Sequence, residues 1–268
     1  MSTATIYEAL RDRVRGEQPV ALATVLEGPN VGAKLLLSPA QEPIGSLGNV
    51  DLDRVVGRDA LAELEAGRTG VRHYGSEGQN NPDDPAIESV SVFIESWAPP
   101  PQMLIFGAVD FTAALARFAK LLGYHVTVCD ARAVFATPAR FPMADEVVCE
   151  WPDRYLAKHG DGLGPRDAVC VLTHDAKFDV PAIVGALATD VGYLGAMGSR
   201  RTHARRVERL QEAGVTDAQL VRVMAPIGLD IGARTPEETA ISICAEIIAA
   251  RTGRDARSLR DASGPIHA

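Results

Sequence analysis

Two hydrophobic patterns divide the chain near residue 100. Before it, apolar residues spaced four apart predict an amphipathic helix over Thr5–Arg15, and a second helix is expected over Arg54–Glu65. Runs rich in β-branched and aromatic residues predict strands over Val20–Val25, Ala33–Leu37, Val71–Tyr74 and Glu88–Ser96. Turn-forming residues fill two further segments, which we expect to be loops: Ile44–Asp53 and Gly75–Pro85. This half therefore predicts a small α+β domain.

Three consecutive prolines follow Ala98 and separate the two patterns. Proline lacks the N–H donor of a central strand and cannot continue a helix, so Pro99–Pro101 is expected to be a stiff extended joint. We therefore place a domain boundary there, with a first domain over residues 1–98 and a second over residues 102–252. Residues 253–268 are polar and are expected to form a flexible tail.

Short apolar runs alternate with helical segments after the joint. The expected strands are Met103–Phe106, His125–Cys129, Glu146–Cys149, Ala168–Leu172 and Val191–Leu194. The expected helices are Phe111–Leu122, Trp151–His159, Val180–Leu187, Arg200–Ala213 and Pro236–Thr252. Such alternation is typical of a parallel sheet covered by helices on both faces. The predicted fold class is α/β, with a Rossmann-like doubly wound parallel sheet preceded by the smaller α+β domain.

Composition and charge narrow the class of protein. The 268 residues are 46% hydrophobic and 23% charged, as in an ordinary globular chain. The net charge of −8 argues against a nucleic-acid binder, and no apolar run reaches the length of a membrane span. The acidity is uneven, because residues 1–100 carry 8 basic and 15 acidic side chains whereas residues 101–268 carry 19 and 20. The N-terminal segment lacks the apolar core of a signal peptide, so we expect a soluble cytoplasmic protein.

The four cysteines, at positions 129, 149, 170 and 244, show neither a CxxC pair nor the spacing of metal ligands. Three of them lie in apolar, strand-like runs. We therefore expect buried, reduced thiols and no metal site.

The first strand after the joint runs into a turn at the position of the dinucleotide-binding fingerprint. Gly107 provides the first glycine, and Asp130 ends the next strand, where an acidic residue binds a ribose hydroxyl. Val109 and Thr112 stand where the fingerprint has its second and third glycines. Asp110 places negative charge where a phosphate would lie, and it also suits a helix N-cap. The turn is either a weakened NAD(P) site or a structural turn, and the two substitutions favour the structural interpretation.

A second glycine-rich segment precedes an arginine-rich helix. Ser199 is suited to cap this helix, whose N-terminus attracts anions. Arg200 and Arg201 lie in its first turn, where cations oppose the helix dipole, so a bound phosphate would justify their placement. We expect Arg206 and Arg209 on a solvated basic face. The residues predicted to hold a phosphate are Gly195, Gly198, Ser199, Arg200 and Arg201.

Two further polar segments follow strands or precede the last helix. His174 and Asp175 come after the Ala168–Leu172 strand, where side chains line the ligand crevice of a doubly wound sheet. Alternatively, Asp175 caps the next helix and His174 packs in the turn. Asp230 lies within Gly228–Gly232, whose two glycines indicate a tight loop close to a ligand or a partner.

Three segments of the second half together resemble one known family. The segments are VLTHDAKFDVPAI, GYLGAMGSRRTHARRVERL and PIGLDIGARTPEETAISICAEI. They are similar to segments of the XdhC/CoxI family, maturation factors for molybdenum hydroxylases such as xanthine dehydrogenase and carbon monoxide dehydrogenase. The resemblance is specific over residues 103–250 and weak over residues 1–100. It implies a small N-terminal domain followed by a Rossmann-type domain.

The resemblance also implies a cofactor-binding chaperone rather than a turnover enzyme. Family members are described as binding molybdenum cofactor, protecting it while a separate desulfurase sulfurates it, and handing it to the apo-hydroxylase. For this chain the implied ligand is molybdopterin or its nucleotide form. The implied partners are a molybdenum hydroxylase and a cysteine desulfurase-type protein, and we also expect a homodimer. The phosphate residues named above would act with His174, Asp175, Asp230, Gly107 and Asp130 around the cofactor.

The sequence departs from the family at two places. Val109 and Thr112 interrupt a glycine turn that family members usually keep. Family members also carry a GSxxGGCxE-like segment, and the nearest match, Gly45–Asp53, has Asp51 at the cysteine position. Two other functions stay open. One is a nucleotide-dependent oxidoreductase, suggested by the fold and Asp130. The other is a docking or regulatory subunit without cofactor, suggested by the acidic first domain and the missing cysteine.

Overall fold

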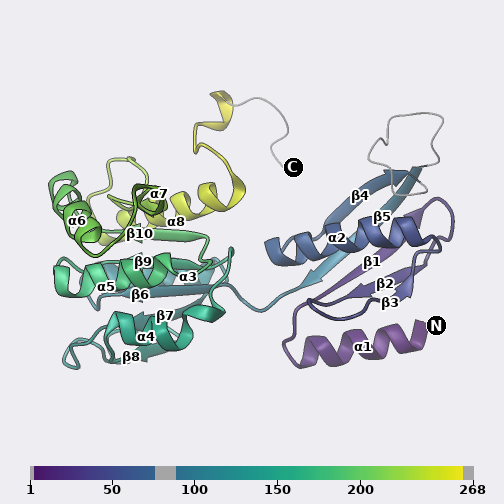
Figure 1. The fold of residues 1–268 in the computed structure, drawn as a ribbon, viewed down its shortest axis with the longest axis horizontal. Helices are drawn as coiled ribbons and strands as arrows, with labels where there is room; N and C mark the ends of the chain where they lie inside the picture. Colours follow the sequence, from purple (N-terminus) through teal and green to yellow (C-terminus); the bar gives the residue numbers. More distant parts are fainter. Residues whose placement is uncertain (1–2, 76–88, 262–268) are drawn as a thin grey trace. The chain divides into compact units, whose positions relative to one another are not determined.

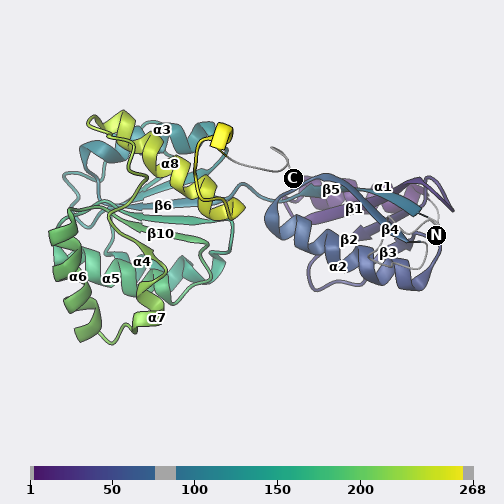
Figure 2. The ribbon, with the colours of Figure 1, turned by 90° about the horizontal axis from the view of Figure 1, so that it is seen from above.

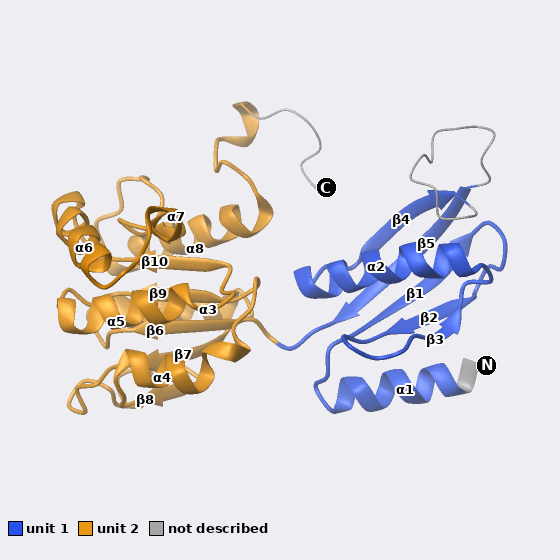
Figure 3. Cartoon of the chain, in the orientation of Figure 1, with its two compact units in different colours: residues 1–99 blue, residues 100–268 orange. Residues whose placement is uncertain are grey.

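The computed structural model of the chain describes residues 3–75 and 89–261. The chain folds into two compact units, residues 1–99 and residues 100–268 (Figure 3). The loop expected over Gly75–Pro85 lies, beyond Gly75, outside the described residues, as do residues 262–268 of the expected tail. Residues 98–101 belong to neither a helix nor a strand.

The first unit is an antiparallel sheet with a helix on each face. Its elements are α1 (Thr3–Arg15), β1 (Val20–Glu27), β2 (Lys34–Leu37), β3 (Ile44–Ser46), α2 (Val50–Ala66), β4 (Gly70–Gly75) and β5 (Ser89–Trp97). The strands lie in the order β3-β2-β1-β5-β4, and each neighbouring pair is antiparallel. Alternate residues of β1 point to opposite faces, so Ala21 and Ala23 pack in the core under α2 while Val20 and Leu22 pack with α1.

The second unit contains a six-stranded parallel sheet. Its strands are β6 (Gln102–Phe106), β7 (His125–Cys129), β8 (Glu146–Val148), β9 (Ala168–Val171), β10 (Tyr193–Ala196) and β11 (Val223–Met224). They lie in the order β8-β7-β6-β9-β10-β11, and every neighbouring pair is parallel. The chain leaves β8 and returns to the other side of β6, so the order reverses between β6 and β9, as in doubly wound nucleotide-binding folds. The predicted fold class is confirmed.

Helices cover both faces of this sheet (Figures 1 and 2). They are α3 (Asp110–Leu121), α4 (Pro152–His159), α5 (Ala176–Leu187), α6 (Arg200–Glu212), α7 (Asp217–Leu220) and α8 (Pro236–Thr252), with the 3-10 turns η1 (Gly160–Gly162) and η2 (Leu259–Asp261). Met103 and Ile105 of β6 pack with α3 and α8. Leu104 and Phe106 pack on the other face with α4, α5 and α6. The four apolar residues of this strand therefore contribute to both cores, because their side chains alternate between the two faces.

The structure differs from the predicted elements in short or polar segments. Ile44–Asp53, expected to be a loop, contains β3 and the start of α2. Helix α5 begins at Ala176 rather than at Val180, because Asp175 caps it by accepting a hydrogen bond from the Lys177 N–H. Helix α7 and strand β11 are too short to produce a periodic signal. No helix within the described ranges combines the length and hydropathy of a membrane span.

Candidate functional site

The predicted site residues of the second unit gather at one edge of its sheet. Because the strands are parallel, their carboxyl ends meet at the same edge, which is where doubly wound folds bind ligands. Gly107 follows β6, Asp130 follows β7, and His174 follows β9. Gly198 and Asp230 come after β10 and β11. The structure therefore brings segments far apart in the sequence to a common edge.

Gly107 lies against Thr173 where the strand order reverses. Gly107 has a φ of +111°, and a Cβ atom there would lie 2.7 Å from Thr173 Cγ2 and 3.0 Å from Thr173 N. Both the backbone conformation and the close approach require glycine. The end of β6 therefore lies directly against the end of β9. Folds of this class bind their ligands at this position, where the strand order reverses.

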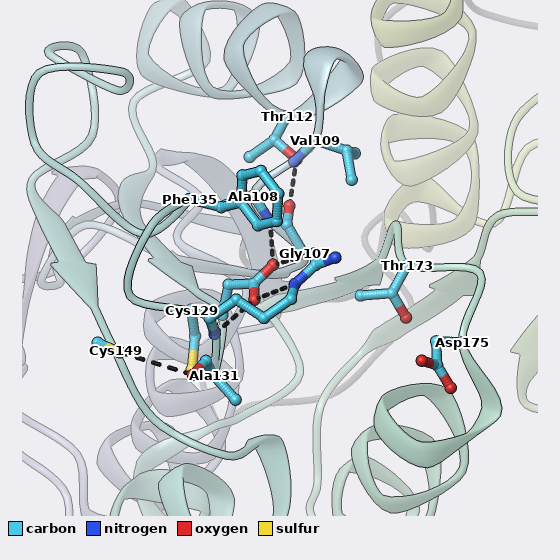
Figure 4. A network of polar contacts seen from close by, with 12 residues as sticks. Gly107, Ala108, Val109, Thr112, Cys129, Ala131, Phe135, Cys149, Thr173 and Asp175 are labelled. Atoms are coloured by element: carbon cyan, nitrogen blue, oxygen red, sulfur yellow. Dashed lines mark hydrogen bonds and ion pairs between the residues drawn. The ribbon is translucent and has the colours of Figure 1, made fainter.

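The turn after β6 is hydrogen-bonded within the chain (Figure 4). The Thr112 hydroxyl donates to Gly107 O and accepts from the Val109 N–H at 3.4 Å. The Asp130 carboxylate accepts from the Ala108 N–H at 2.8 Å. In a dinucleotide site such backbone N–H groups face the pyrophosphate, whereas here side chains of the protein engage them. The geometry favours the structural interpretation of this turn.

Asp130 has all its acceptor positions filled. One carboxylate oxygen accepts from the Arg132 N–H and Nε, both at 2.9 Å, and the other accepts from the Ala108 N–H and from Arg132 Nη2 at 2.7 Å. A carboxylate offers about four lone-pair sites. Burial acts to raise the pKa of Asp130, but the hydrogen bonds from Arg132 and Ala108 hold that pKa below its usual value. A ribose hydroxyl would have to displace one of these donors.

Arg132 connects this carboxylate to aromatic rings. Its guanidinium carbon lies 4.6 Å from the ring centroid of Phe135 and 5.6 Å from that of Phe178. Phe135 is 38% exposed, and Trp151, whose ring centroid is 5.0 Å from that of Phe178, is 40% exposed. Partly exposed rings beside an arginine are able to stack against a flat heterocycle. The sequence analysis missed this cluster because its members come from three separate loops and helix starts.

Two predictions for this edge were wrong. Asp110 is not the N-cap of α3: Val109 occupies that position, and the Asp110 side chain is 93% exposed, 3.8 Å from Arg140. Val109 makes no side-chain cap, and the Thr112 hydroxyl accepts the Val109 N–H, which is the role of the N3 side chain in a capping box. Cys149, expected to be buried, is exposed because β8 ends at Val148. The other three cysteines are buried as expected.

The segment after β10 forms the start of α6. Ser199 caps the helix as predicted, because its hydroxyl accepts the Thr202 N–H at 3.1 Å. Arg200 and Arg201 are exposed, and neither makes a hydrogen bond or ion pair with the residues that the structure describes. Gly195 does not belong to this loop: it is buried inside β10, where a Cβ atom would lie 2.4 Å from Ile227 Cδ1. Packing explains that glycine.

A buried ion pair joins the ends of β9 and β10. Arg206 Nη2 lies 2.8 Å from Asp179 Oδ2 and donates to Met197 O at 2.7 Å. The Thr173 hydroxyl donates to the other oxygen of Asp179. Burial raises the pKa of Asp179, and the Arg206 guanidinium opposes that rise. The remaining terminal nitrogen of Arg206, Nη1, is buried without a hydrogen-bond partner within the described ranges.

The prediction that Arg206 lies on a solvated face was wrong. Its side chain is 3% exposed, whereas Arg209 is exposed as expected. The signal in the sequence is the position of Arg206 one helical turn before Leu210, which is fully buried. The acidic partner, Asp179, lies on α5 and could not be named from the sequence.

The remaining predicted residues of this edge differ in availability. Asp175 caps α5, as the structural alternative for this residue expected. His174 and Asp230 are exposed, and neither makes a hydrogen bond with a described residue. Gly228 is explained by packing, because a Cβ atom there would lie 2.6 Å from Ser242 Oγ of α8.

In the first unit, the Gly45–Asp53 segment, which is the nearest match to the family's cysteine motif, contains the N-cap and the first turn of α2. Asn49 caps α2 by accepting the Asp51 N–H at 2.8 Å. Asp51 itself is exposed, 3.5 Å from Arg54. Asp53 fixes the preceding turn by accepting the Leu47 N–H at 2.6 Å. Over residues 3–75 and 89–261 no group of three or more His, Cys, Asp or Glu side chains is arranged to hold a metal ion.

Family models match both units of the chain. A model described as the XdhC Rossmann domain matches residues 103–247, and a model of the XdhC and CoxI family matches residues 14–75. The chain belongs to the XdhC and CoxI family. Within this XdhC Rossmann domain lie the internally bonded turn, the buried ion pair and the start of α6.

Several relatives are similar over part of their length. A Bacillus subtilis protein named as a probable xanthine dehydrogenase subunit is 33% identical over 164 residues, 61% of this chain and 47% of that protein. The uncharacterized Escherichia coli protein YqeB is 27% identical over 246 residues, 86% of this chain and 43% of its own length. The E. coli molybdenum cofactor insertion chaperone PaoD is 34% identical over 99 residues, 37% of this chain and 31% of its own length. The chain thus spans less than half the length of these relatives.

A solved structure shares the fold. A crystal structure described as that of a xanthine dehydrogenase from Bacillus halodurans superposes with a TM-score of 0.53 at 21% identity, covering 94% of this chain and 97% of that one. At this identity the likeness shows the fold alone.

Proposed function

We propose that the chain is a maturation factor that binds molybdenum cofactor at the carboxyl edge of the parallel sheet and delivers it to a molybdenum hydroxylase, such as a xanthine or carbon monoxide dehydrogenase. The observation that carries the proposal is a pair of exposed arginines in the first turn of α6, Arg200 and Arg201, which have no partner among the residues that the structure describes. Cations there oppose the helix dipole, and a phosphate contacting both the free N–H groups and the guanidinium groups reverses that cost. The phosphate of a molybdopterin supplies that anion.

The neighbouring residues fit a pterin that carries a phosphate. Gly198 has a φ of +144°, and a Cβ atom there would lie 3.6 Å from Arg206 Nη2, so the loop lies directly against a buried guanidinium. Phe135 and Trp151 are partly exposed aromatic side chains that would contact the flat pterin or the base of its nucleotide form. The residues of the proposed site are Gly198, Ser199, Arg200 and Arg201 for the phosphate, with the exposed His174 and Asp230 along the same edge.

The proposal assigns binding and delivery to the chain, and the redox chemistry to the cofactor in its final enzyme. Because Asp51 stands where the family's motif has cysteine, the Gly45–Asp53 segment offers no thiol, and we place the cofactor on the second unit. The similarity to a protein named as a molybdenum cofactor insertion chaperone supports this role. A sulfurating partner of the cysteine desulfurase type and a homodimeric state belong to the same proposal.

Small molecules that co-purify with the chain test the proposal. Protein made in cells with intact cofactor synthesis should release a pterin phosphate, detected by mass spectrometry and by the fluorescence of its oxidised form. The double variant Arg200→Ala/Arg201→Ala should carry much less. Arg209→Ala, an exposed arginine of the same helix, is the matched control and should keep the pterin.

Other outcomes would overturn the proposal in distinguishable ways. A chain that carries no pterin and takes none up is not a cofactor carrier; if it still captures a molybdenum hydroxylase, it is a docking protein. Equal loss of pterin in Arg209→Ala would mean that general positive charge attracts the ligand and that no site exists at the start of α6.

A further inference from the structure

A pocket lies at the amino edge of the parallel sheet, where β6, β7 and β8 begin. Its volume is about 310 Å³, and its walls are the start of these strands, helix α4 and turn η1. We propose that this pocket binds a small planar nitrogen heterocycle that is uncharged or cationic. The proposal is independent of the cofactor site, because the pocket lies at the amino ends of the strands and shares no residue with that site. Its polar lining consists of Gln102, His125, Thr127, Glu146, Tyr155 and His159.

The register of the sheet places the polar residues side by side. Gln102 is paired with His125, and Thr127 is paired with Glu146. These positions alternate along their strands, so the side chains point to the face that α4 covers. Farther along the same face the register pairs Phe106 with Cys129, and both are fully buried in the core. A parallel sheet covered on both faces normally has apolar residues at all such positions, so this group of polar residues departs from the pattern of the fold.

Helix α4 packs on this face of the sheet but does not fill the space above the first residues of β6, β7 and β8. It has 8 residues and is followed at once by η1. Gly162 of η1 lines the pocket, and a Cβ atom there would meet no other atom within 4 Å. Leu104, Leu156 and Leu163 form the apolar part of the lining. The pocket therefore combines an apolar wall with a polar one, as small-molecule sites do.

Hydrogen-bonding groups in the pocket are available to a ligand. His125 Nδ1 is buried and has no hydrogen-bond partner among the residues described. Burial raises the pKa of the Tyr155 phenol, and its hydrogen bond with the Thr127 side chain opposes that rise, so these two hydroxyl groups lie together in the pocket. The Tyr155 ring stacks on that of His159, with centroids 4.5 Å apart and planes at 29°, and this pair forms a flat wall. A flat ring with both N–H donors and ring-nitrogen acceptors complements these groups.

Charge and size limit the class of ligand. Glu146 is the acidic group of the lining, and none of the described residues that form it is a lysine or an arginine. An anion would meet a carboxylate without a fixed cation, whereas N–H donors would find an acceptor in Glu146. The volume is near the lower end of small-molecule pockets, which span about 300–1,000 Å³. One fused ring system fits this space, and a phosphorylated nucleotide does not fit the charge.

Titration of the full chain with adenine, monitored by calorimetry, tests the inference. We expect one adenine per chain, with binding weakened about tenfold or more by Glu146→Gln, by Thr127→Val and by Gly162→Phe, which fills the pocket but keeps its polar groups. Asp161→Asn removes a charge from η1 outside the lining and should leave binding unchanged. Thermal melting of each variant separates lost binding from lost folding.

The result that would overturn the inference is wild-type protein that binds no adenine at millimolar concentration, or a folded Gly162→Phe variant that binds it as well as the wild type. Arg200→Ala/Arg201→Ala should bind adenine normally, so failure of the cofactor proposal and failure of this one are measured separately.

Discussion

Arg206 and Asp179 form an ion pair in which both side chains are almost completely buried, 3% and 4% exposed. The pair also fixes its surroundings, since Arg206 binds Met197 O and Asp179 accepts the Thr173 hydroxyl. The ends of β9 and β10 are thereby tied together through α5 and α6. The proposed phosphate residues begin at Gly198, directly after Met197, so this pair determines where the backbone enters the site.

Substitution of this pair should be strongly non-additive. Asp179→Leu leaves an arginine that cannot lose its charge, and we expect it to cost about 3–5 kcal/mol of unfolding free energy. Arg206→Met should cost less, because burial already raises the pKa of Asp179 and the carboxyl group is able to take up a proton. The double variant should lose less unfolding free energy than the two single variants lose together, as measured by urea unfolding.

The same variants give a pH test. In Arg206→Met the folded-state pKa of Asp179 should lie further above its unfolded value, so this variant should gain stability relative to wild type as the pH falls from neutral. Additive single effects, or no pH dependence in the difference, would show that the two side chains are not coupled.

Gly107→Ala should destabilise the second unit by about 2–4 kcal/mol, because it adds a clash to an unfavourable backbone conformation. The new Cβ atom would lie 2.7 Å from Thr173 Cγ2 at a φ of +111°. Gly123→Ala is the control: its φ is +82°, but a Cβ atom there meets nothing within 4 Å. It should cost only the conformational strain, about 1 kcal/mol. Equal losses in thermal or urea unfolding would mean that the contact with Thr173 does not matter.

Asp130 should stabilise the fold at neutral pH and lose that effect in acid. Its folded-state pKa lies below the usual 3.8, so the stabilisation is present above that value and disappears as the pH falls through the folded-state pKa. Asp130→Asn should cost about 2 kcal/mol at pH 7, because it weakens the charged hydrogen bonds to Arg132. The difference in unfolding free energy between wild type and variant should shrink below about pH 4. A difference that stays constant down to about pH 3 would contradict this account.

Cys149 should be the thiol that reacts first with Ellman's reagent in the native protein. It is exposed, whereas the other three cysteines are buried. Burial raises the pKa of Cys129 to about 12 and that of Cys244 to about 11, and it also raises the pKa of Cys170. We expect one fast thiol in native protein, none in Cys149→Ser, and all four of the wild-type thiols after unfolding. Two or more fast thiols in the native protein would show that a buried cysteine is accessible.

Local signals in the sequence predicted most of the elements. The strand His125–Cys129 matches the prediction at both ends, because a short run of buried, mostly β-branched residues inside a parallel sheet carries a strong pattern. Ser199 was predicted as a cap, and capping was one of the two alternatives for Asp175, because capping depends on residues only two or three positions apart. Strands β3 and β11 were missed because segments of 3 and 2 residues are too short to carry a periodic signal.

Signals for the site were weaker because its contacts are not local. The sequence indicated that the turn at Gly107 is either a weakened NAD(P) site or a structural turn. The structure was needed to show that Thr112 and Asp130 accept hydrogen bonds from its N–H groups. Arg206 was predicted to be solvated because its partner, Asp179, is 27 positions away on another helix. Gly195 was assigned to a loop because the sequence does not show that Ile227 packs over it.

The sequence by itself determined the α/β class, the parallel sheet, the family and the placement of glycines, arginines and acids after strands, because these depend on periodicity and on residue type along the chain. The tertiary structure decided which of those groups remain available. Arg132 and the Ala108 N–H fill the acceptor positions of Asp130, and Arg206 is buried beside Asp179 of α5, whereas Arg200 and Arg201 have no partner among the described residues. The polar group at the start of β6, β7 and β8 likewise became a pocket only through strand register and the short helix above it.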